Sequence, residues 1–212
     1  GEAFVHPGLL HSKADLDRMR FAVAEKTMPI YEGFQVLAKS PHANADYRRR
    51  GPFSEWGRAT GAADHSGEAQ SDAKAAYQNA LMWAITGDRS HANKSIEIIN
   101  AWMGTLKRVT GIDGVLASGL QGFKFANAAE ILRYTDSPWA EDDAKRCEQW
   151  LMNVWHPTIE HYAYFANGNW ETAALQTKMA IAVYCNDRRL FEETVRYAVS
   201  GAGNGSIPHM IV

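Results

Sequence analysis

The chain has 212 residues, of which 46% are hydrophobic and 22% charged, a composition typical of one globular domain with a sizeable core. A net charge of −2 gives no reason to expect a nucleic-acid partner. No run of about eighteen apolar residues occurs, so we expect no membrane-spanning helix. The histidines are scattered, which predicts neither a metal site nor a cofactor. Cys147 and Cys185 lie in helical patterns and are expected to be free thiols, with a disulfide as the alternative.

The N-terminal part predicts an extended segment followed by two helices. Residues 1–11 have no periodic apolar pattern and are expected to form an extended lead-in. Ser12 and Asp15 then stand at the spacing of a capping box, with aspartate in place of glutamate, and predict a helix start. A second helix is expected to begin near Thr27 and Pro29, because proline is favoured in the first helical turn.

Residues 40–70 interrupt the helical periodicity and are too many for an ordinary connection. Their Trp56 and Arg58 suit an acidic sugar, because a guanidinium pairs with a carboxylate and an indole stacks on a pyranose face. A solvated loop without a function explains the same composition. The sequence leaves both interpretations open.

From residue 71 to residue 200 apolar residues recur at helical spacing, broken by short polar turns. Ser71 and Asp72 have the pattern of a cap for a long helix that ends at Gly87, and Ser90 that of a cap for the next helix. The glycine-rich residues 111–119 are expected to form a loop, and residues 201–206 a flexible one. The other expected helices span about 120–134, 137–154, 170–185 and 187–200.

One short pattern occurs twice in the chain. Residues 84–89 and 183–188 both end an apolar helix at Gly or Asn, continue with Asp-Arg, and start an amphipathic helix. Such similarity between helical hairpins is typical of a solenoid or a closed α/α toroid. Eight helical segments without an alternating strand pattern predict an all-α fold built of antiparallel helical hairpins. Trp83, Trp102 and Trp150 lie on the apolar faces and are expected in the core.

A polar, aromatic turn is expected at residues 162–171. Its Asn167-Gly168 pair favours a turn, because both residues tolerate positive φ. Asn169 then stands where a helix N-cap belongs, before a new apolar periodicity. The stretch is explained either as a capped turn that Trp170 holds against the helix, or as a site in which amides and aromatic rings meet a ligand.

Four stretches resemble the alginate lyase superfamily of polysaccharide lyases: residues 77–88, 92–102, 128–134 (Ala-Ala-Glu-Ile-Leu-Arg-Tyr) and 167–170 (Asn-Gly-Asn-Trp). The resemblance implies an incomplete α/α toroid with a long substrate groove. It also implies β-elimination on a polyuronate such as alginate or glucuronan, and export to the periplasm or out of the cell. Domains of this superfamily are longer, so we expect residues 1–212 to be a single domain shortened at its C-terminus.

The resemblance also implies roles for residues. β-Elimination removes the C5 proton of a uronate, and the neighbouring carboxylate must be neutralised first. Asn167 and Asn169 match the neutralising position of the superfamily, although its frequent histidine is absent. The usual tyrosine motif is missing, so the base is expected beyond Val212, with His156, His161, Tyr162 and Tyr164 as weaker candidates. The residues expected to bind the sugar chain are Trp56, Arg58, Gln121, Lys124 and Trp170.

Two other functions are compatible with helical hairpins. A glycoside hydrolase would use paired carboxylates, for which Asp64, Glu68 and Asp72 are candidates. A non-catalytic module would bind a glycan and leave it intact. A lyase leaves an unsaturated uronate and a hydrolase a saturated end, so the products separate the three. The expected partner is an acidic polysaccharide, with no nucleic acid and no membrane.

Overall fold

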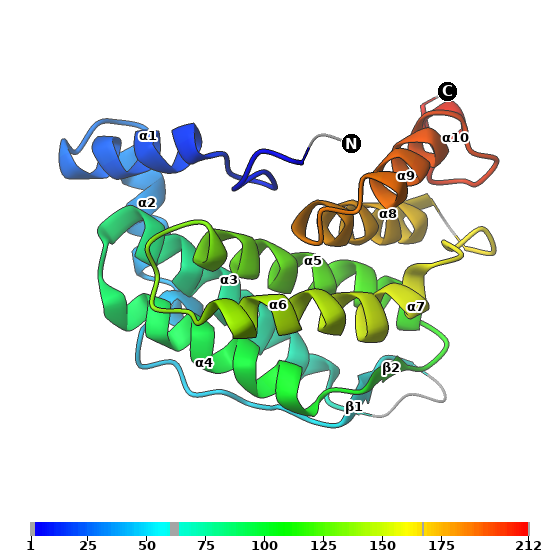
Figure 1. Ribbon diagram of the computed structural model, residues 1–212, viewed down its shortest axis with the longest axis horizontal. Helices are drawn as coiled ribbons and strands as arrows, with labels where there is room; N and C mark the ends of the chain where they lie inside the picture. Colours follow the sequence, from blue (N-terminus) through cyan, green and yellow to red (C-terminus); the bar gives the residue numbers. More distant parts are fainter. Residues whose placement is uncertain (1–2, 60–63, 167, 212) are drawn as a thin grey trace.

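The computed structural model describes residues 3–59, 64–166 and 168–211, and helices dominate it (Figure 1). The all-α prediction is therefore confirmed. The helices are α1 (Lys13–Ala24), α2 (Ile30–Ala38), α3 (Ser66–Thr86), α4 (Arg89–Thr105), α5 (Gly114–Arg133), α6 (Glu141–Trp150), α7 (His156–Ile159), α8 (Gly168–Tyr184), α9 (Arg188–Ser200) and α10 (Ile207–Met210). A 3₁₀ turn, η1 (Pro41–Ala43), follows α2, and a π-helical turn, η2 (Leu151–Trp155), joins α6 to α7.

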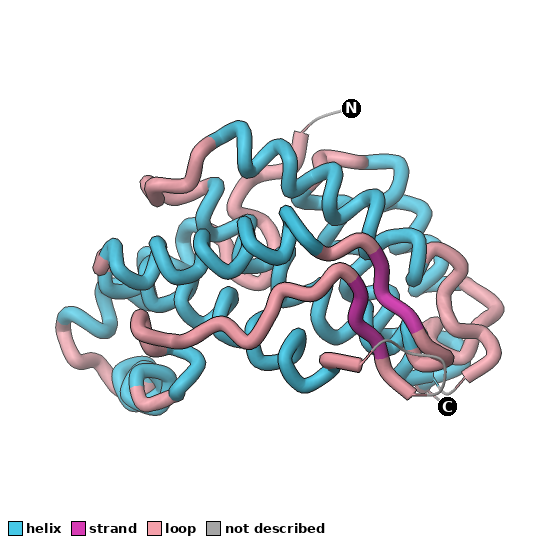
Figure 2. The backbone as a smooth tube through the Cα atoms, turned by 90° about the horizontal axis from the view of Figure 1, so that it is seen from below, coloured by secondary structure: helices cyan, strands magenta, loops and turns pink. Residues whose placement is uncertain are grey.

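Two three-residue strands, β1 (Glu55–Gly57) and β2 (Arg108–Thr110), differ from the expectation that no strand occurs. They pair in parallel, with Trp56 opposite Val109, and Figure 2 shows them side by side. Strands this short show no alternation of apolar and polar residues, so no strand period could be detected. Their pairing fastens the loop before α3 to the loop before α5.

The helices form two layers. The inner layer consists of α3, α5 and α8, with α5 packed between the other two. The outer layer includes α4, which packs on α3, and α9, which packs on α8. Between the layers, Phe125 of α5 packs against three indoles, with ring centroids 6.1 Å from Trp102, 5.3 Å from Trp150 and 5.6 Å from Trp155. The expected core positions of Trp83, Trp102 and Trp150 are confirmed, and all three are buried.

The repeated hairpin pattern has the same geometry at both places. Gly87 and Asn186 both adopt the left-handed conformation, with φ of 75° and 53°. The carboxylates of Asp88 and Asp187 then accept backbone hydrogen bonds from the first turn of the following helix, both at 2.9 Å. The helical hairpins are thus confirmed, and their closure into a toroid stays a prediction.

Several helices begin elsewhere than expected. α3 begins at Ser66, so Asp72 lies inside the helix and does not cap it. α5 begins at Gly114 within the expected glycine-rich loop, and α6 begins at Glu141, after the expected Ser137 cap. α8 begins at Gly168, which places Asn169 inside its first turn. In α3 and α5 the residues that suggested a cap or a loop, Asp72 and Gly119, contact distant parts of the chain.

Gly119 lies where α5 crosses α8 most closely. A Cβ atom built on Gly119 would be 2.5 Å from the carbonyl carbon of Ala173. The Gly119 carbonyl accepts hydrogen bonds from the Thr177 hydroxyl at 2.7 Å and from the Gln176 amide at 3.0 Å. Glycine is therefore required here by the approach of two backbones.

Replacing Gly119 with alanine should destabilise the fold by about 1–3 kcal/mol, because α5 and α8 must separate to admit the methyl group. The matched control is Gly104→Ala in α4, where a Cβ meets nothing within 4 Å. That substitution should stabilise the protein by up to about 1 kcal/mol, since alanine is the better helix former. Chemical denaturation of both variants measures the difference, and equal stabilities would contradict the close crossing.

The lead-in crosses the C-terminal halves of the inner helices. The backbone N–H of Leu10 donates to Asn127 at 3.1 Å and that of Gly8 to Glu130 at 2.8 Å, while the His11 ring lies 2.6 Å from the Tyr77 hydroxyl. The N-terminal halves of α3, α5 and α8 are left for a site. Among the described residues no helix is long and apolar enough to cross a bilayer.

Candidate active site

The turn between α7 and α8 is held by an aromatic stack. Tyr162 has a φ of 57°, and its ring lies 3.7 Å from that of Tyr197 with an angle of 13° between the planes. The ammonium of Lys178 lies 4.2 Å from the Tyr162 ring centroid and 3.2 Å from its hydroxyl. Stacking and a cation near the ring thus fix Tyr162 as a structural residue.

Lys178 is only 1% exposed, so its charge needs partners inside the protein. Its ammonium donates to the Glu160 carbonyl at 3.1 Å and lies 3.2 Å from the Glu193 carboxylate. Glu160 belongs to the turn and Glu193 to α9. One buried cation therefore joins the turn to α8 and α9.

Glu171 holds the glycine-rich segment 201–206 against the first turn of α8. Its buried carboxylate accepts a hydrogen bond from the Gly205 N–H at 3.0 Å, and a Cβ on Gly203 would collide with the same oxygen. Ser206 is buried as well and donates to the Gly201 carbonyl at 2.7 Å. Residues 201–206 form a loop as expected, and its glycines let the backbone pack directly onto a buried carboxylate. Its flexibility stays a prediction.

Asn169 projects from the first turn of α8 and is exposed. It borders a depression of about 270 Å³ between α5 and α8, whose other lining residues include Leu120, Thr172, Gln176 and Met210. Its amide has no hydrogen-bond partner within the described ranges, so both the N–H₂ and the carbonyl can meet a ligand. Asn167 lies outside the described residues. Trp170 is partly buried, and its ring lies 6.4 Å from that of Phe165.

Gln121 and Lys124 lie on α5, the neighbouring inner helix. Gln121 is 4% exposed, and its side-chain oxygen accepts a hydrogen bond from the Lys124 ammonium at 2.8 Å. Burial, followed by the charge of Lys74, lowers the pKa of Lys124 to about 8. A cation in this state binds an anion more strongly than a surface lysine does, because less water competes.

The two residues of the long loop that were expected to bind sugar differ in their exposure to solvent. Trp56 is 1% exposed and packs into the core, with its ring 6.0 Å from that of Trp155. No face of its indole is open to a sugar, which argues against the predicted binding role. The β1–β2 pairing draws Trp56 inward, and the sequence did not indicate that pairing. Arg58 is exposed, and its guanidinium lies 3.6 Å from the Asp113 carboxylate.

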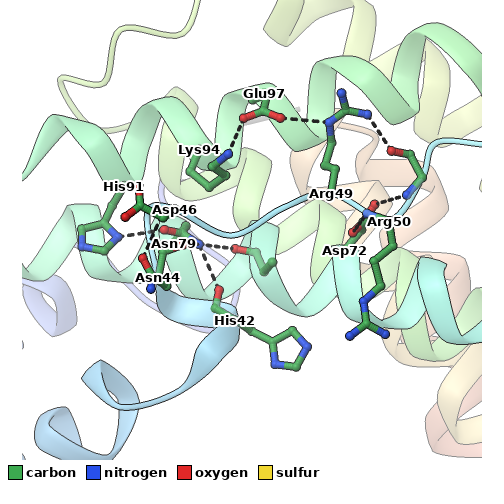
Figure 3. A network of polar contacts seen from close by, with 12 residues as sticks. His42, Asn44, Asp46, Arg49, Arg50, Asp72, Asn79, His91, Lys94 and Glu97 are labelled. Atoms are coloured by element: carbon green, nitrogen blue, oxygen red, sulfur yellow. Dashed lines mark hydrogen bonds and ion pairs between the residues drawn. The ribbon is translucent and has the colours of Figure 1, made fainter.

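Asp72 fastens the loop that precedes β1. Its carboxylate, 0% exposed, accepts hydrogen bonds from the backbone of Arg50 and Gly51, both at 2.9 Å; Figure 3 shows Asp72 beside Arg50. It also accepts hydrogen bonds from the side chains of Tyr47 and Trp102, both at 2.8 Å. Burial and the hydrogen bond to Asp72 raise the pKa of Tyr47. A carboxylate so fully bonded has no free oxygen for acid catalysis, which removes Asp72 from the hydrolase candidates.

Asn79, two turns further along α3, fastens the preceding part of the loop. Its amide nitrogen donates to the carbonyls of His42 at 2.9 Å and Asn44 at 3.3 Å, and its oxygen lies 2.8 Å from the His91 ring (Figure 3). Sequence reasoning missed both anchors. The detectable signal was a pair of polar residues, Asp72 and Asn79, seven positions apart on an alanine-rich helix, which places them on one face.

The sequence model of the alginate lyase family matches residues 17–210, nearly the whole chain. The chain belongs to this family. Membership supports polysaccharide lyase activity in general. Searches of curated proteins and of solved structures found no significant match.

The residues near the turn that were expected as candidates for a base differ in their surroundings. Burial, and then the charge of Lys178, lower the pKa of His156. His161 and Tyr164 are exposed, and Tyr162 is held by Tyr197 and Lys178. None of the four borders the depression beside Asn169. The structure therefore brings the amide of Asn169 near α5 but brings none of these candidates with it.

Proposed function

We propose that this member of the alginate lyase family cleaves a uronate polymer, alginate or glucuronan, by β-elimination. The reaction removes the C5 proton and expels the glycosidic oxygen at C4. Because a charged carboxylate at C5 resists loss of that proton, donors that neutralise it stabilise the negative charge that develops. Amide groups can supply such donors without a metal ion.

The observation that carries the proposal is the exposed, unpaired amide of Asn169 at the N-terminus of α8. The N-terminus of this helix adds partial positive charge where the amide points, and both favour a carboxylate. We assign Asn169 and Asn167 to the neutralising role. The first turn of α8, which carries Asn169, is held by Glu171, and Lys178 of the same helix holds the preceding turn, so the Asn169 amide is positioned before substrate binds.

Around this centre we propose that the substrate chain runs along the inner helices. Arg58, Gln121, Lys124 and Trp170 are assigned to sugar binding on the basis of their charge, amide and aromatic chemistry. Trp56 is left out of the proposal because it is buried. A polymer of this kind is degraded outside the cytoplasm, so we propose a periplasmic or secreted enzyme with an acidic polysaccharide as its partner.

The direct test follows the ultraviolet absorbance of unsaturated uronate over time with alginate and with glucuronan. We expect absorbance to rise with one of the two polymers. A rise in reducing ends without absorbance would indicate hydrolysis instead. Binding of the polymer without either signal would indicate a non-catalytic glycan-binding module, and both outcomes would overturn the proposal.

A further inference from the structure

Two partly buried lysines of the inner layer have no counter-ion among the residues that the structure describes. Lys74 lies on α3 and Lys124 on the adjacent α5. Within the described ranges no carboxylate lies within ion-pair distance of either ammonium, and the partner recorded for Lys124 is the neutral oxygen of Gln121. Two ammonium groups on adjacent helices, one of them bonded to a buried amide, can meet an anion from outside the protein.

The charge of Lys74 adds to the cost of burying the Lys124 ammonium. Burial and the neighbouring Lys74 disfavour the charged form of Lys124, whose pKa falls to about 8. His42, in η1, is affected in the same sense, because burial, Lys74 and Arg50 lower its pKa, against an opposing effect of Asp72. Four hydrogen bonds from Tyr47, Arg50, Gly51 and Trp102 already occupy the carboxylate of Asp72. Among the described residues Asp72 therefore pairs with neither ammonium group.

Helix geometry places the pair on the face that the lead-in partly covers. Lys74 precedes Tyr77 by three residues, and Lys124 precedes Asn127 by three, so each lies on the same helix face as its neighbour. Tyr77 and Asn127 both contact the lead-in. The lysines thus lie just beyond the lead-in contacts, Lys74 in the N-terminal half of α3 and Lys124 at the middle of α5, on the side toward the end from which Asn169 projects.

We propose that Lys74 and Lys124, with Gln121 orienting the latter, bind a carboxylate of the polymer at a sugar other than the one that loses its proton. A carboxylate would accept charge-assisted hydrogen bonds from both lysines and remove their mutual repulsion. The proposal rests on the proposed function and adds to it a specificity site for a polyanion. It predicts that a chain with neutral, methyl-esterified sugars binds less well.

The site has a definite pH dependence. Because the pKa of Lys124 is lowered, its charged form is present below about pH 8 and is lost as the pH rises through that value. A bound carboxylate favours the charged form of Lys124, so in the complex this charge is lost at a higher pH. Affinity for a uronate chain should therefore decline above about pH 8, while the carboxylates of the ligand keep their charge throughout.

The test measures by calorimetry the binding of two short saturated oligouronates, one built of mannuronate and one of glucuronate. Each is titrated into the wild-type full chain, into Lys74→Met and into Lys124→Met. Each variant should bind about tenfold more weakly than the wild type. The control is Lys145→Met on the exposed face of α6, which should bind as the wild type does. Between about pH 7 and about pH 9.5 the wild type should lose affinity, and Lys124→Met should lose less. Unchanged affinity in both lysine variants would overturn the site.

Measurements of folding and of turnover distinguish failure of the lysine site from failure of the proposed function. Thermal unfolding should show Lys124→Met to be at least as stable as the wild type, since an unpaired cation is removed. If the wild type makes no unsaturated product yet binds in a lysine-dependent way, the lyase chemistry is wrong and the site stands. If product forms and the lysine variants bind normally, the proposed function stands and the site is wrong.

Discussion

Replacing Asn169 with alanine should lower kcat on a polyuronate by about 10²- to 10³-fold, the usual effect of removing one donor from a site of developing charge. The fold should be unaffected, because the Asn169 side chain is exposed and has no hydrogen-bond partner within the described ranges. The KM should change little if the amide acts mainly on the charge that develops in the transition state. Initial rates of unsaturated-uronate formation, together with the thermal unfolding midpoint, measure both quantities.

The matched control is Asn153→Ala. Asn153 is also an exposed asparagine, but it belongs to the π-helical turn η2, away from the depression beside Asn169. It should keep wild-type rates. An Asn169→Ala protein with wild-type kcat would exclude the residue from the reaction, whatever its exposure.

The helices could be predicted from sequence wherever the signal was local. The capping box of Ser12 and Asp15 is present, with the Asp15 N–H donating to the Ser12 hydroxyl at 3.1 Å. The left-handed stops at Gly87 and Asn186 are equally local. The cap of α4 is Asp88 and not the expected Ser90, whose N–H instead donates to the Asp88 carboxylate. Each depends on a few consecutive residues, and no distant part of the chain competes with them.

The prediction failed where a residue serves a distant partner. Asp72 has the local pattern of a cap, yet its carboxylate binds a loop more than twenty positions earlier in the chain. Gly119 suggested a loop, yet it permits α5 and α8 to touch. Trp56 suggested a sugar platform, yet strand pairing buries it. For each of these three residues, the local composition and spacing fit the predicted role as well as the observed one. The sequence alone could therefore not separate the two roles.

The same difference between local signals and distant partners applies to the candidate site. Asn169 was identified from a turn motif and a family resemblance, and its exposure agrees with a ligand-binding role. The residues that hold its turn, Lys178 and Glu171, were not identified, because each acts through partners on α9 or in the segment 201–206. A charged residue in the middle of an apolar helix face was the available signal for both.

Removing the carboxylate of Asp72 should destabilise the protein by about 3–5 kcal/mol in Asp72→Ala, because several donors lose their acceptor at once. The donors are the buried Trp102 indole, the N–H groups of Arg50 and Gly51, and the Tyr47 hydroxyl. Asp72→Asn should be milder, since one oxygen remains. Chemical denaturation measures the loss, and the control Asp142→Ala, exposed in the first turn of α6, should cost at most about 1 kcal/mol.

Trypsin distinguishes a released loop from a general loss of stability. The loop contains Arg48, Arg49 and Arg50, and the Arg49 side chain is itself held by Glu97 at 3.0 Å and the Gly51 carbonyl at 2.6 Å. In native conditions Asp72→Ala should be cut first at these arginines, because Asp72 no longer binds the backbone there. Tyr47→Phe removes one donor, should cost about 1 kcal/mol, and serves as the test if Asp72→Ala does not fold. Cleavage spread evenly over the chain would mean that Asp72 supports the core of α3 and does not specifically hold the loop.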